Sequence, residues 1–294
     1  MRINHIEDLP WIEDRAVIIN CGTKEVSTLA LLSTLRYAGV PILLIDCESR
    51  DGSLEHFLNL MTRLDFDVLS APLRGHGITL DWLFGAIKAE KILLVDSDVE
   101  ILDATIFRFM REFIDEPSAF GAGFVNGPTW IDDLPGDPLD GAYLQERPWM
   151  PLTLLKVKFI REALAAGISF SARTIYNDFF FSETLSRRLV RLRSIFPWFR
   201  RFQSPKMLRQ TYYGHRPSLI YCDTGALMLQ HLKYQRELSF VGLPDRYHRR
   251  YVTHFGGITR IALEQFSIDE PRKTTLNDQV SRRLKDGYGM VISE

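Results

Sequence analysis

The sequence contains few cysteines and no long apolar run. Its 294 residues include only Cys21, Cys47 and Cys222, an odd number without the close spacing of metal ligands. This usage disfavours a disulfide framework or a structural zinc site and indicates a reducing compartment. The apolar runs fall far short of the roughly 18 residues that a spanning helix needs, and the N-terminus lacks an apolar signal segment. We therefore expect a cytoplasmic protein without a membrane-crossing segment.

An excess of charge of one sign is also missing. The 36 Lys and Arg residues nearly balance the 37 Asp and Glu residues, which gives a net charge of -1. A protein that holds duplex nucleic acid through an overall positive field is therefore disfavoured, and no nucleic-acid partner is expected. The sequence has no internal repeat and no low-complexity tract, so a single domain is the simplest division.

Short apolar runs alternate with helical periods over the first 115 residues. Alternation of this kind predicts an α/β fold, with a mostly parallel sheet and helices on both faces. Ligands of such sheets bind beyond the carboxyl ends of the strands. Strands are expected at residues 16–19, 42–45, 68–70 and 92–95. Helices are expected at residues 26–37, 53–64, 80–87 and 106–113.

The second half of the chain is less regular. An apolar run predicts a strand over residues 119–124. Residues 126–151 are rich in Pro, Gly, Asp and Trp, which predicts a long loop over a site. A helix is expected over residues 153–166.

The sharpest motif is an apolar strand that begins at Lys91 and ends in Asp96-Ser97-Asp98. A buried strand that delivers two carboxylates to its carboxyl end is well placed to bind a divalent cation through hard oxygen ligands. An isolated Asp-x-Asp is as often a turn or a helix cap, because so short a motif has a high false-positive rate. The segments around it therefore decide its interpretation.

Four further segments support the cation interpretation. They contain Cys21-Gly22-Thr23, Asp46-Cys47-Glu48 before Asp-Gly-Ser, Arg74-Gly75 in a third-strand loop, and His254 before Gly256-Gly257. With the acidic strand end, their order over residues 16–260 resembles that of glycosyltransferases with the GT-A fold, of the inverting, family-two type. Cys47 stands where that family usually has a second acid, Glu48 where it has Gly, and the customary Asn of the third loop is absent.

The resemblance implies one GT-A-like domain with a division of labour. A nucleotide-sugar-binding half would span about residues 1–115, an acceptor half about 116–260, and a C-terminal tail 261–294. The enzyme would be a hexosyltransferase-like protein of polysaccharide biosynthesis. It would transfer sugar from a nucleotide-sugar, above all a UDP-sugar, to a saccharide or lipid-linked acceptor, with inversion.

The resemblance also implies a cofactor and a set of site residues. Mn²⁺ or Mg²⁺ would be held by Asp96, Asp98 and His254. A divalent cation suits this chemistry, since it neutralises the charge that develops on a diphosphate leaving group. The implied donor-binding residues are Cys21, Gly22, Thr23, Asp46, Glu48, Arg74, Gly75, Asp96, Ser97 and Arg260.

An inverting transferase needs a general base that deprotonates the acceptor hydroxyl as it attacks. The family's usual Glu-Asp pair is missing, and three acids compete for the role. Asp223 precedes a small Gly-Ala pair that resembles an acceptor-side segment, and Asp178 lies roughly where the usual base motif falls. Asp245 follows a proline and is most simply a turn residue. We rank Asp223 before Asp178 as the catalytic base.

Residues 184–222 form a basic segment. It contains nine Lys or Arg residues and no acidic residue, together with leucines at helical spacing. One interpretation is a helix on an anionic membrane surface, which would make the protein peripheral at the inner face of the membrane. The other is a solvated helix that packs through its leucines. A lipid-diphosphate acceptor would also explain the arginines, because they bind phosphates bidentately.

Two other classes of protein remain open. A phosphatase of the haloacid dehalogenase type would use Asp96 as nucleophile and Asp98 as acid/base. Glu100 counts against it, because that pattern has Thr or Val there, and so do the three strand-helix units before the motif. A catalytically silent nucleotide-sugar-binding subunit would explain the departures at Cys47 and Glu48. Release of a nucleoside diphosphate from a nucleotide-sugar separates the three classes.

Overall fold

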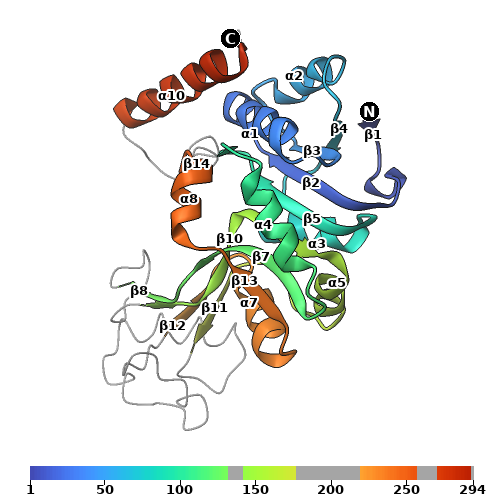
Figure 1. The fold of residues 1–294 in the computed structure, drawn as a ribbon, viewed down its shortest axis with the longest axis vertical. Coiled ribbons are helices and arrows are strands. Elements are labelled where there is room, and N and C mark those ends of the chain that lie inside the picture. The colour runs from blue at the N-terminus through green and yellow to red at the C-terminus, as the bar shows by residue number, and fades with distance from the viewer. Residues whose placement is uncertain (132–141, 177–218, 257–269, 293–294) are drawn as a thin grey trace, which may run out of the picture.

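An eight-stranded sheet forms the centre of the protein (Figure 1). The computed structural model describes residues 1–131, 142–176, 219–256 and 270–292. The strand order is β1-β4-β3-β2-β5-β10-β7-β13. The bounds of the strands are β1 Arg2–Ile3, β2 Ile12–Asn20, β3 Ile42–Cys47, β4 Asp67–Ala71, β5 Ala89–Asp96, β7 Ala119–Asn126, β10 Arg147–Lys156 and β13 Ser239–Gly242.

The order of the strands creates a switch point in the middle of the sheet. The neighbours β4, β3, β2 and β5 are parallel, and the chain runs outward from β2 through β3 and β4 before it returns to the other side as β5. Open α/β sheets bind ligands beyond the carboxyl ends of the strands at such a point. β10 is antiparallel to both of its neighbours, whereas β13 is parallel to β7. The predicted α/β fold, a mostly parallel sheet with helices on both faces, is confirmed.

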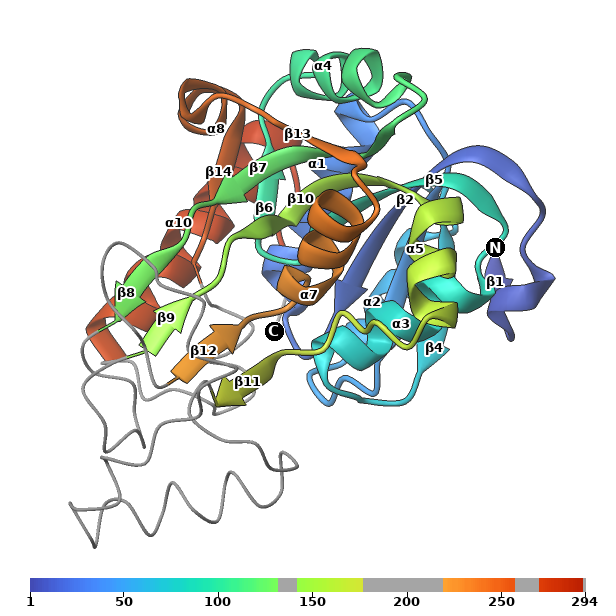
Figure 2. The ribbon, with the colours of Figure 1, turned by 90° about the horizontal axis from the view of Figure 1, so that it is seen from below.

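Helices cover both faces of the sheet (Figure 2). One face carries α3 (His76–Ala86), α5 (Val157–Ala165), α7 (Ala226–Leu229) and a π-helical turn at Gln230–Gln235. The other carries α1 (Lys24–Tyr37), α2 (Ser53–Leu60), α4 (Thr105–Ile114) and α8 (Asp245–Tyr251). Successive strand residues alternate between the two layers, since Val17 belongs to the first buried cluster and Ile18 to the second. A short 3-10 helix spans Ile6–Asp8.

Two smaller sheets extend the core. A four-stranded sheet has the order β11-β12-β9-β8, with bounds Arg173–Tyr176, Leu219–Cys222, Ala142–Leu144 and Thr129–Ile131. A two-stranded ribbon pairs β6 (Val99–Ile101) with β14 (Val252–His254). The C-terminal helix α10 (Glu270–Tyr288) packs against α1. In Figure 1 the four-stranded sheet lies at the opposite end of the molecule from α10.

The regular units of the first half are confirmed, with strands and helices at the expected places. The expected helix over 153–166 is wrong in its first part, because residues 153–156 belong to β10 and α5 begins at Val157. β10 lies in the interior of the sheet, and the helical layers on both sides bury its two faces, Leu155 in one layer and Leu154 in the other. A strand of this kind is a continuous apolar run that periodicity cannot distinguish from a buried helix.

The expected long loop over residues 126–151 is also wrong in part. It contains the strands β8 and β9 and the beginning of β10. The pairing of β10 with β7 shifts register between Pro148 and Thr153. Proline lacks the N–H that a ladder requires, and it therefore lies where regular pairing stops. In the described parts of the chain, no helix is long and apolar enough to cross a membrane.

Candidate functional site

A cleft of about 1130 Å³ opens at the switch point of the main sheet. It is bounded by the carboxyl ends of β2, β5 and β7, the start of β10, the loop before α3, and the ends of β12 and β14. Residues from the first and the second half of the sequence meet there. Those on which the site depends are Cys21, Arg74, Gly75, His76, Asp96, Ser97, Asp98, Arg147, Trp149, Asp223 and His254.

The acidic motif forms the turn between β5 and β6. Asp96 ends β5 and lies half-exposed in the cleft, with its Oδ1 3.9 Å from Nε2 of His76. Ser97 is buried and also lines the cleft. Asp98 lines the cleft as well, although only 4% of its surface is exposed. The two carboxylates thus reach the same cleft from a rigid strand end.

His254 faces Asp98 across the β6–β14 ribbon. Its Nε2 lies 3.3 Å from Oδ1 of Asp98, and the backbone N–H of Phe255 donates to the Asp98 carbonyl at 2.9 Å. The ring of Trp149 packs edge-on against the His254 imidazole, with 5.3 Å between the ring centroids. The fold therefore joins two residues that are 156 positions apart in the sequence.

These side chains fit a divalent cation that is shared with a ligand. No group of three His, Cys, Asp or Glu side chains suited to a metal occurs in the described parts of the chain. Asp98 and His254 form a pair that offers one oxygen and one nitrogen donor, and Asp96 lines the same cleft without completing such a group. Cations of nucleotide sites are held by one or two carboxylates plus phosphate oxygens, so a small donor set is the expected one. The carboxylate oxygens suit Mg²⁺ and Mn²⁺ alike.

The loop after β2 is held by a buried polar network around Asp46. Only 1% of the Asp46 surface is exposed. Its Oδ1 accepts a hydrogen bond from Asn20 Nδ2 at 2.7 Å, and its Oδ2 accepts one from the Ser49 backbone at 3.2 Å. Ser49 in turn accepts from the backbone N–H of Gly22 at 2.8 Å. In this geometry Asp46 holds the loop after β2, and its contact with a donor stays a prediction.

Two more expected donor contacts lie away from the cleft. Thr23 is buried, and its hydroxyl donates to the side-chain oxygen of Asn20 at 2.9 Å. Glu48 is exposed, has a φ of 49°, and accepts a hydrogen bond from the Leu73 backbone at 3.2 Å. Both residues therefore shape the loops around the cleft. Gly22 has a φ of 64°, a conformation that favours glycine, and it turns the chain from β2 into α1.

The loop before α3 supplies a basic rim. Arg74 and Gly75 line the cleft as the sequence predicts, and His76 joins them as the first residue of α3. The guanidinium of Arg74 is exposed and lies 5.8 Å from the ring centroid of Trp82. A cationic side chain with a free face at the rim suits an anionic or aromatic ligand.

The acceptor side of the cleft contains the ion pair Asp223–Arg147. Asp223 follows β12, and its Oδ2 lies 3.1 Å from Nε of Arg147. Its Oδ1 accepts the backbone N–H of Thr224 at 2.8 Å. The pair is partly exposed, so a ligand in the cleft can reach it. Of the other expected site residues, Asp178 and Arg260 lie outside the described residues.

Three residues that were not predicted to belong to the site also line the cleft. They are His76, Arg147 and Trp149. Arg147 and Trp149 belong to the segment that was expected to be a loop, where no periodic pattern marks them. His76 stands in the Arg-Gly-His-Gly motif, so its place beside Arg74 and Gly75 was the available signal.

All three cysteines are buried, and Cys21 and Cys47 line the cleft. Burial, with a smaller contribution from neighbouring acids, raises the pKa of Cys21. Burial raises the pKa of Cys47 to about 12 and that of Cys222 to about 11. All three thiols are therefore neutral at physiological pH, and a cysteine nucleophile has no support here, because the thiolate is the reactive form.

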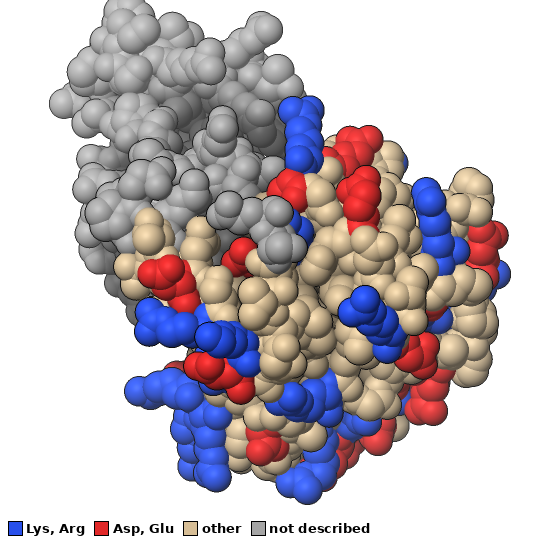
Figure 3. Space-filling model, turned by 90° about the horizontal axis from the view of Figure 1, so that it is seen from above, with Lys and Arg blue, Asp and Glu red and all other residues tan. Residues whose placement is uncertain are grey.

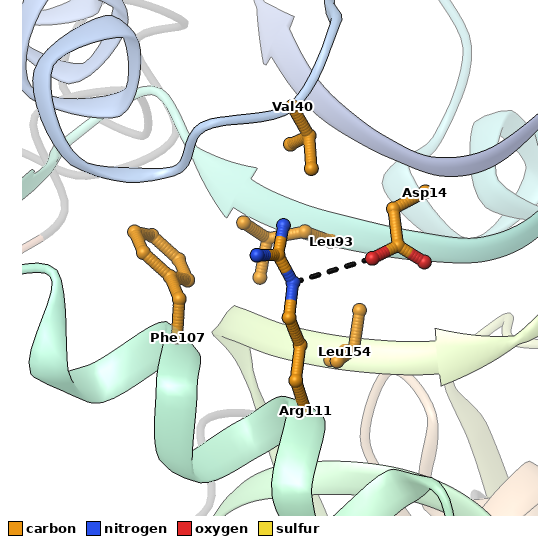
Figure 4. A pocket seen from close by; sticks show the side chains of 6 residues that line it. All are labelled: Asp14, Val40, Leu93, Phe107, Arg111 and Leu154. Carbon is orange, nitrogen blue, oxygen red and sulfur yellow. Dashed lines mark ion pairs between the residues drawn. The ribbon is translucent and has the colours of Figure 1, made fainter.

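A second cavity lies near the amino end of β2. Its volume is about 10 Å³, which is room for about one water molecule. Arg111 Nε lies 3.2 Å from Asp14 Oδ2 at its edge (Figure 4). This cavity is too small for a nucleotide or a sugar.

On the face seen in Figure 3, basic and acidic side chains are interspersed, with a group of basic side chains at one edge.

Comparisons by sequence give no relative. No protein-family model matches the chain, and no curated protein is detectably similar to it.

Comparisons by structure give distant likenesses. Staphylococcus aureus TarS 1–349 in complex with UDP is 14% identical, with a TM-score of 0.38 over 93% of this chain and 72% of that chain. Glucosyl-3-phosphoglycerate synthase from Mycobacterium tuberculosis, in complex with Mn²⁺, UDP and glucosyl-3-phosphoglycerate, is 11% identical, with a TM-score of 0.35 over 50% of this chain and 57% of that chain. A 4-diphosphocytidyl-2C-methyl-D-erythritol synthase from Anaerococcus prevotii is 12% identical, with a TM-score of 0.36 over 65% and 84%. Similarities at this level do not identify the function of the chain, and the evidence for a function comes from the chemistry of the cleft.

Proposed function

We propose that the protein is a glycosyltransferase that moves a sugar from a nucleoside diphosphate donor, a UDP-sugar, to the hydroxyl of a saccharide or lipid-linked acceptor. The observation that carries the proposal is the meeting of Asp96, Asp98 and His254 in a cleft at the switch point of the sheet. An α/β sheet binds nucleotides at such a point, and a diphosphate needs a cation that the protein holds only in part.

The donor half would bind and orient the nucleotide-sugar. Asp96, Asp98 and His254 would hold the cation, and Cys21, Arg74 and Gly75 would contact the nucleotide from the loops. When bound, the cation supplies Lewis-acid stabilisation of the diphosphate leaving group. The polar network around Asp46 keeps the loop after β2 in place. Arg260 remains a proposed phosphate contact.

The acceptor half would supply the general base. In a single displacement, the acceptor oxygen forms a bond to the anomeric carbon while the bond from that carbon to the diphosphate breaks, which inverts the configuration. The acceptor's hydroxyl proton passes to a carboxylate oxygen of Asp223, and the bonding electrons leave with the diphosphate. The partner Arg147 orients Asp223, since its Nε lies 3.1 Å from Oδ2. Asp178 remains the alternative base.

The basic segment 184–222 would lie against an anionic membrane surface or a lipid-linked acceptor. The support is its composition, nine Lys or Arg residues without an acid. Its residues 184–218 lie outside the described parts of the chain. This proposal makes the protein peripheral at the inner face of the membrane.

Release of UDP from a panel of UDP-sugars tests the activity. We expect Mn²⁺-dependent release with one or more sugars, and loss of release in Asp98→Asn, which removes a charged cation ligand. Asp103→Asn is the matched control, because Asp103 is exposed, lines neither of the two cavities described above, and accepts a hydrogen bond from the Thr105 backbone, which Asn also can. Inorganic phosphate as the product would instead indicate a phosphatase, and tight UDP binding without release would indicate a silent binding subunit.

A further inference from the structure

Glu100 is a fully buried carboxylate that the proposed reaction does not use. It is 0% exposed and lies on β6, two residues after Asp98. Arg283 of α10 donates to both of its oxygens, from Nη2 to Oε1 at 2.7 Å and from Nε to Oε2 at 2.9 Å. The hydroxyl of Tyr288 lies 3.4 Å from Oε1. A buried carboxylate is stable only when its charge is paired and hydrogen-bonded, so β6 depends on α10 for its charge balance.

The strand that carries Glu100 is paired with the strand that carries His254. In this ribbon Thr253 lies opposite Glu100, and His254 lies opposite Val99. The backbone N–H of Phe255 then donates to the carbonyl of Asp98 at 2.9 Å. Asp98 and His254 are therefore both attached to the β6–β14 ribbon. A displacement of this ribbon changes the position of both cation-binding side chains.

A second contact joins α10 to the same ribbon. Phe255, the residue directly after His254, is buried in an apolar cluster with Val280 and Leu284 of α10 and with Leu29 of α1. This contact involves β14, whereas the Arg283–Glu100 ion pair involves β6. The helix thus holds each strand of the ribbon by an independent interaction, one apolar and one charged.

We propose that Arg283 is a positioning residue for the cation-binding pair. Through Glu100 it fixes the β6–β14 ribbon and, with it, the separation of Asp98 and His254. The inference rests on the proposed function for the role of that pair in binding a cation, whereas the effect of Arg283 on the ribbon does not. The C-terminal segment was expected from the sequence to be a tail. In this view it supports the wall of the cleft that contains Asp96, Asp98 and His254, which we name the donor wall after the proposed function.

Hydrogen exchange of backbone amides tests the effect on the ribbon. Arg283→Met leaves the Glu100 charge buried without its partner, so we expect faster exchange in peptides that cover residues 97–102 and 251–255 and no change in β3. Arg282→Met is the matched control, because Arg282 is exposed and, within the part of the chain that the structure describes, bonds to the Asp278 carbonyl of its own helix. The double variant Glu100→Gln/Arg283→Met removes both charges and is expected to restore protection.

Calorimetry with Mn²⁺ and UDP tests the effect on the cation pair. We expect Arg283→Met to lower the affinity for Mn²⁺ with UDP by no more than the roughly 10- to 100-fold that follows loss of a residue hydrogen-bonded to a metal ligand, because Arg283 acts through Glu100 and the ribbon. Arg282→Met should bind like the wild type, and the double variant should recover most of the affinity.

The outcomes separate the two proposals. Equal exchange in Arg283→Met and Arg282→Met overturns the positioning role. A uniform rise in exchange that includes β3 also overturns it, because the ion pair then acts only on global stability. Unchanged Mn²⁺ and UDP affinity in Arg283→Met with a loosened ribbon overturns it as well. If the wild type binds neither Mn²⁺ nor UDP while the ribbon responds as expected, the proposed function fails and the effect of Arg283 on the ribbon stands.

Discussion

The two walls of the cleft are built differently. On the donor wall, Asp98 is nearly buried and belongs to a turn that the main sheet and the β6–β14 ribbon hold through backbone hydrogen bonds. On the opposite wall, which contains Asp223 and Arg147 and which we name the acceptor wall after the proposed function, Asp223 is held by one backbone N–H and by the partly exposed Arg147. Solvent reaches this ion pair, whose side chains are 18% and 25% exposed, and weakens the attraction between its charges. The donor wall is thus preorganised, whereas the acceptor wall presents charged groups that a ligand can reorganise.

The largest expected effect is a loss of turnover when the proposed base on the acceptor wall is changed. Asp223→Asn removes the proposed proton acceptor and keeps the shape of the side chain, so turnover should fall by about 10² to 10⁴. Affinity for Mn²⁺ with UDP should stay at the wild-type level, since the donor wall is untouched. Steady-state kinetics and calorimetry on the same preparation measure both. If Asp178→Asn shows this profile and Asp223→Asn stays active, the order of the two candidate bases is reversed.

The basic segment gives the next largest effect and belongs to the acceptor half. Each basic side chain near an anionic leaflet contributes about 1 kcal/mol, so changing Arg187, Arg188, Arg191 and Arg193 to Gln should reduce partitioning to anionic liposomes by about 10² to 10³. Sedimentation with anionic and neutral liposomes, at low and high salt, measures it.

A control for the liposome experiment comes from the donor half. A variant with Arg2, Arg50, Arg63 and Lys88 changed to Gln removes the same charge from exposed positions. It should sediment like the wild type. Equal loss in both variants would show that net charge alone drives binding, and no binding by the wild type would favour a soluble acceptor.

A smaller effect concerns the contact between the halves. A Cβ added to Gly77 on α3 would lie 2.4 Å from Cα of Ser171, in the acceptor half. Gly77→Ala should therefore lower the free energy of unfolding by about 1–3 kcal/mol, because backbone must shift to admit the methyl group. Gly85→Ala is the control on the same helix, since it meets nothing within 4 Å. Denaturant unfolding compares them, and equal stability would refute the close contact.

The smallest expected effect is the thiol reactivity of the native protein. Burial raises the pKa of Cys47 to about 12 and that of Cys222 to about 11, so both remain thiols at pH 8. Labelling with a thiol reagent at pH 8 should be slow on both walls in the folded state and should reach three thiols after unfolding. Rapid labelling of one thiol in the native protein would show that one wall opens.

Much of the donor wall was predictable from the sequence. Each strand and helix of the first half lies within a short, periodic stretch, and parallel strands linked by helices bring their carboxyl ends to one edge. Asp96 and Asp98 were therefore found without tertiary information. The network that joins Asp46 to Asn20 and Ser49 was not predictable in this way, because a motif identifies a residue but not its hydrogen-bond partners.

The acceptor wall was less predictable, because long-range pairing forms it. β10 pairs with β5 and β7, and β12 pairs with β9, and long stretches of sequence separate the paired strands. The prolines and the irregular pairing of β10 hide its strand pattern. Arg147 reaches Asp223 only after both strands have been placed, so no local signal marks it as a site residue.

The sequence by itself determined the alternation of strands and helices, the parallel sheet and the acidic strand end, because these follow from the spacing of neighbouring residues. Only the tertiary structure decided that His254 faces Asp98, that Arg147 faces Asp223, and that α10 closes on the buried Glu100. The physical reason is range. The periodicity of a segment depends on which of its own residues face the core. The partner of a buried charge, by contrast, comes from a segment distant in the sequence that packs beside it.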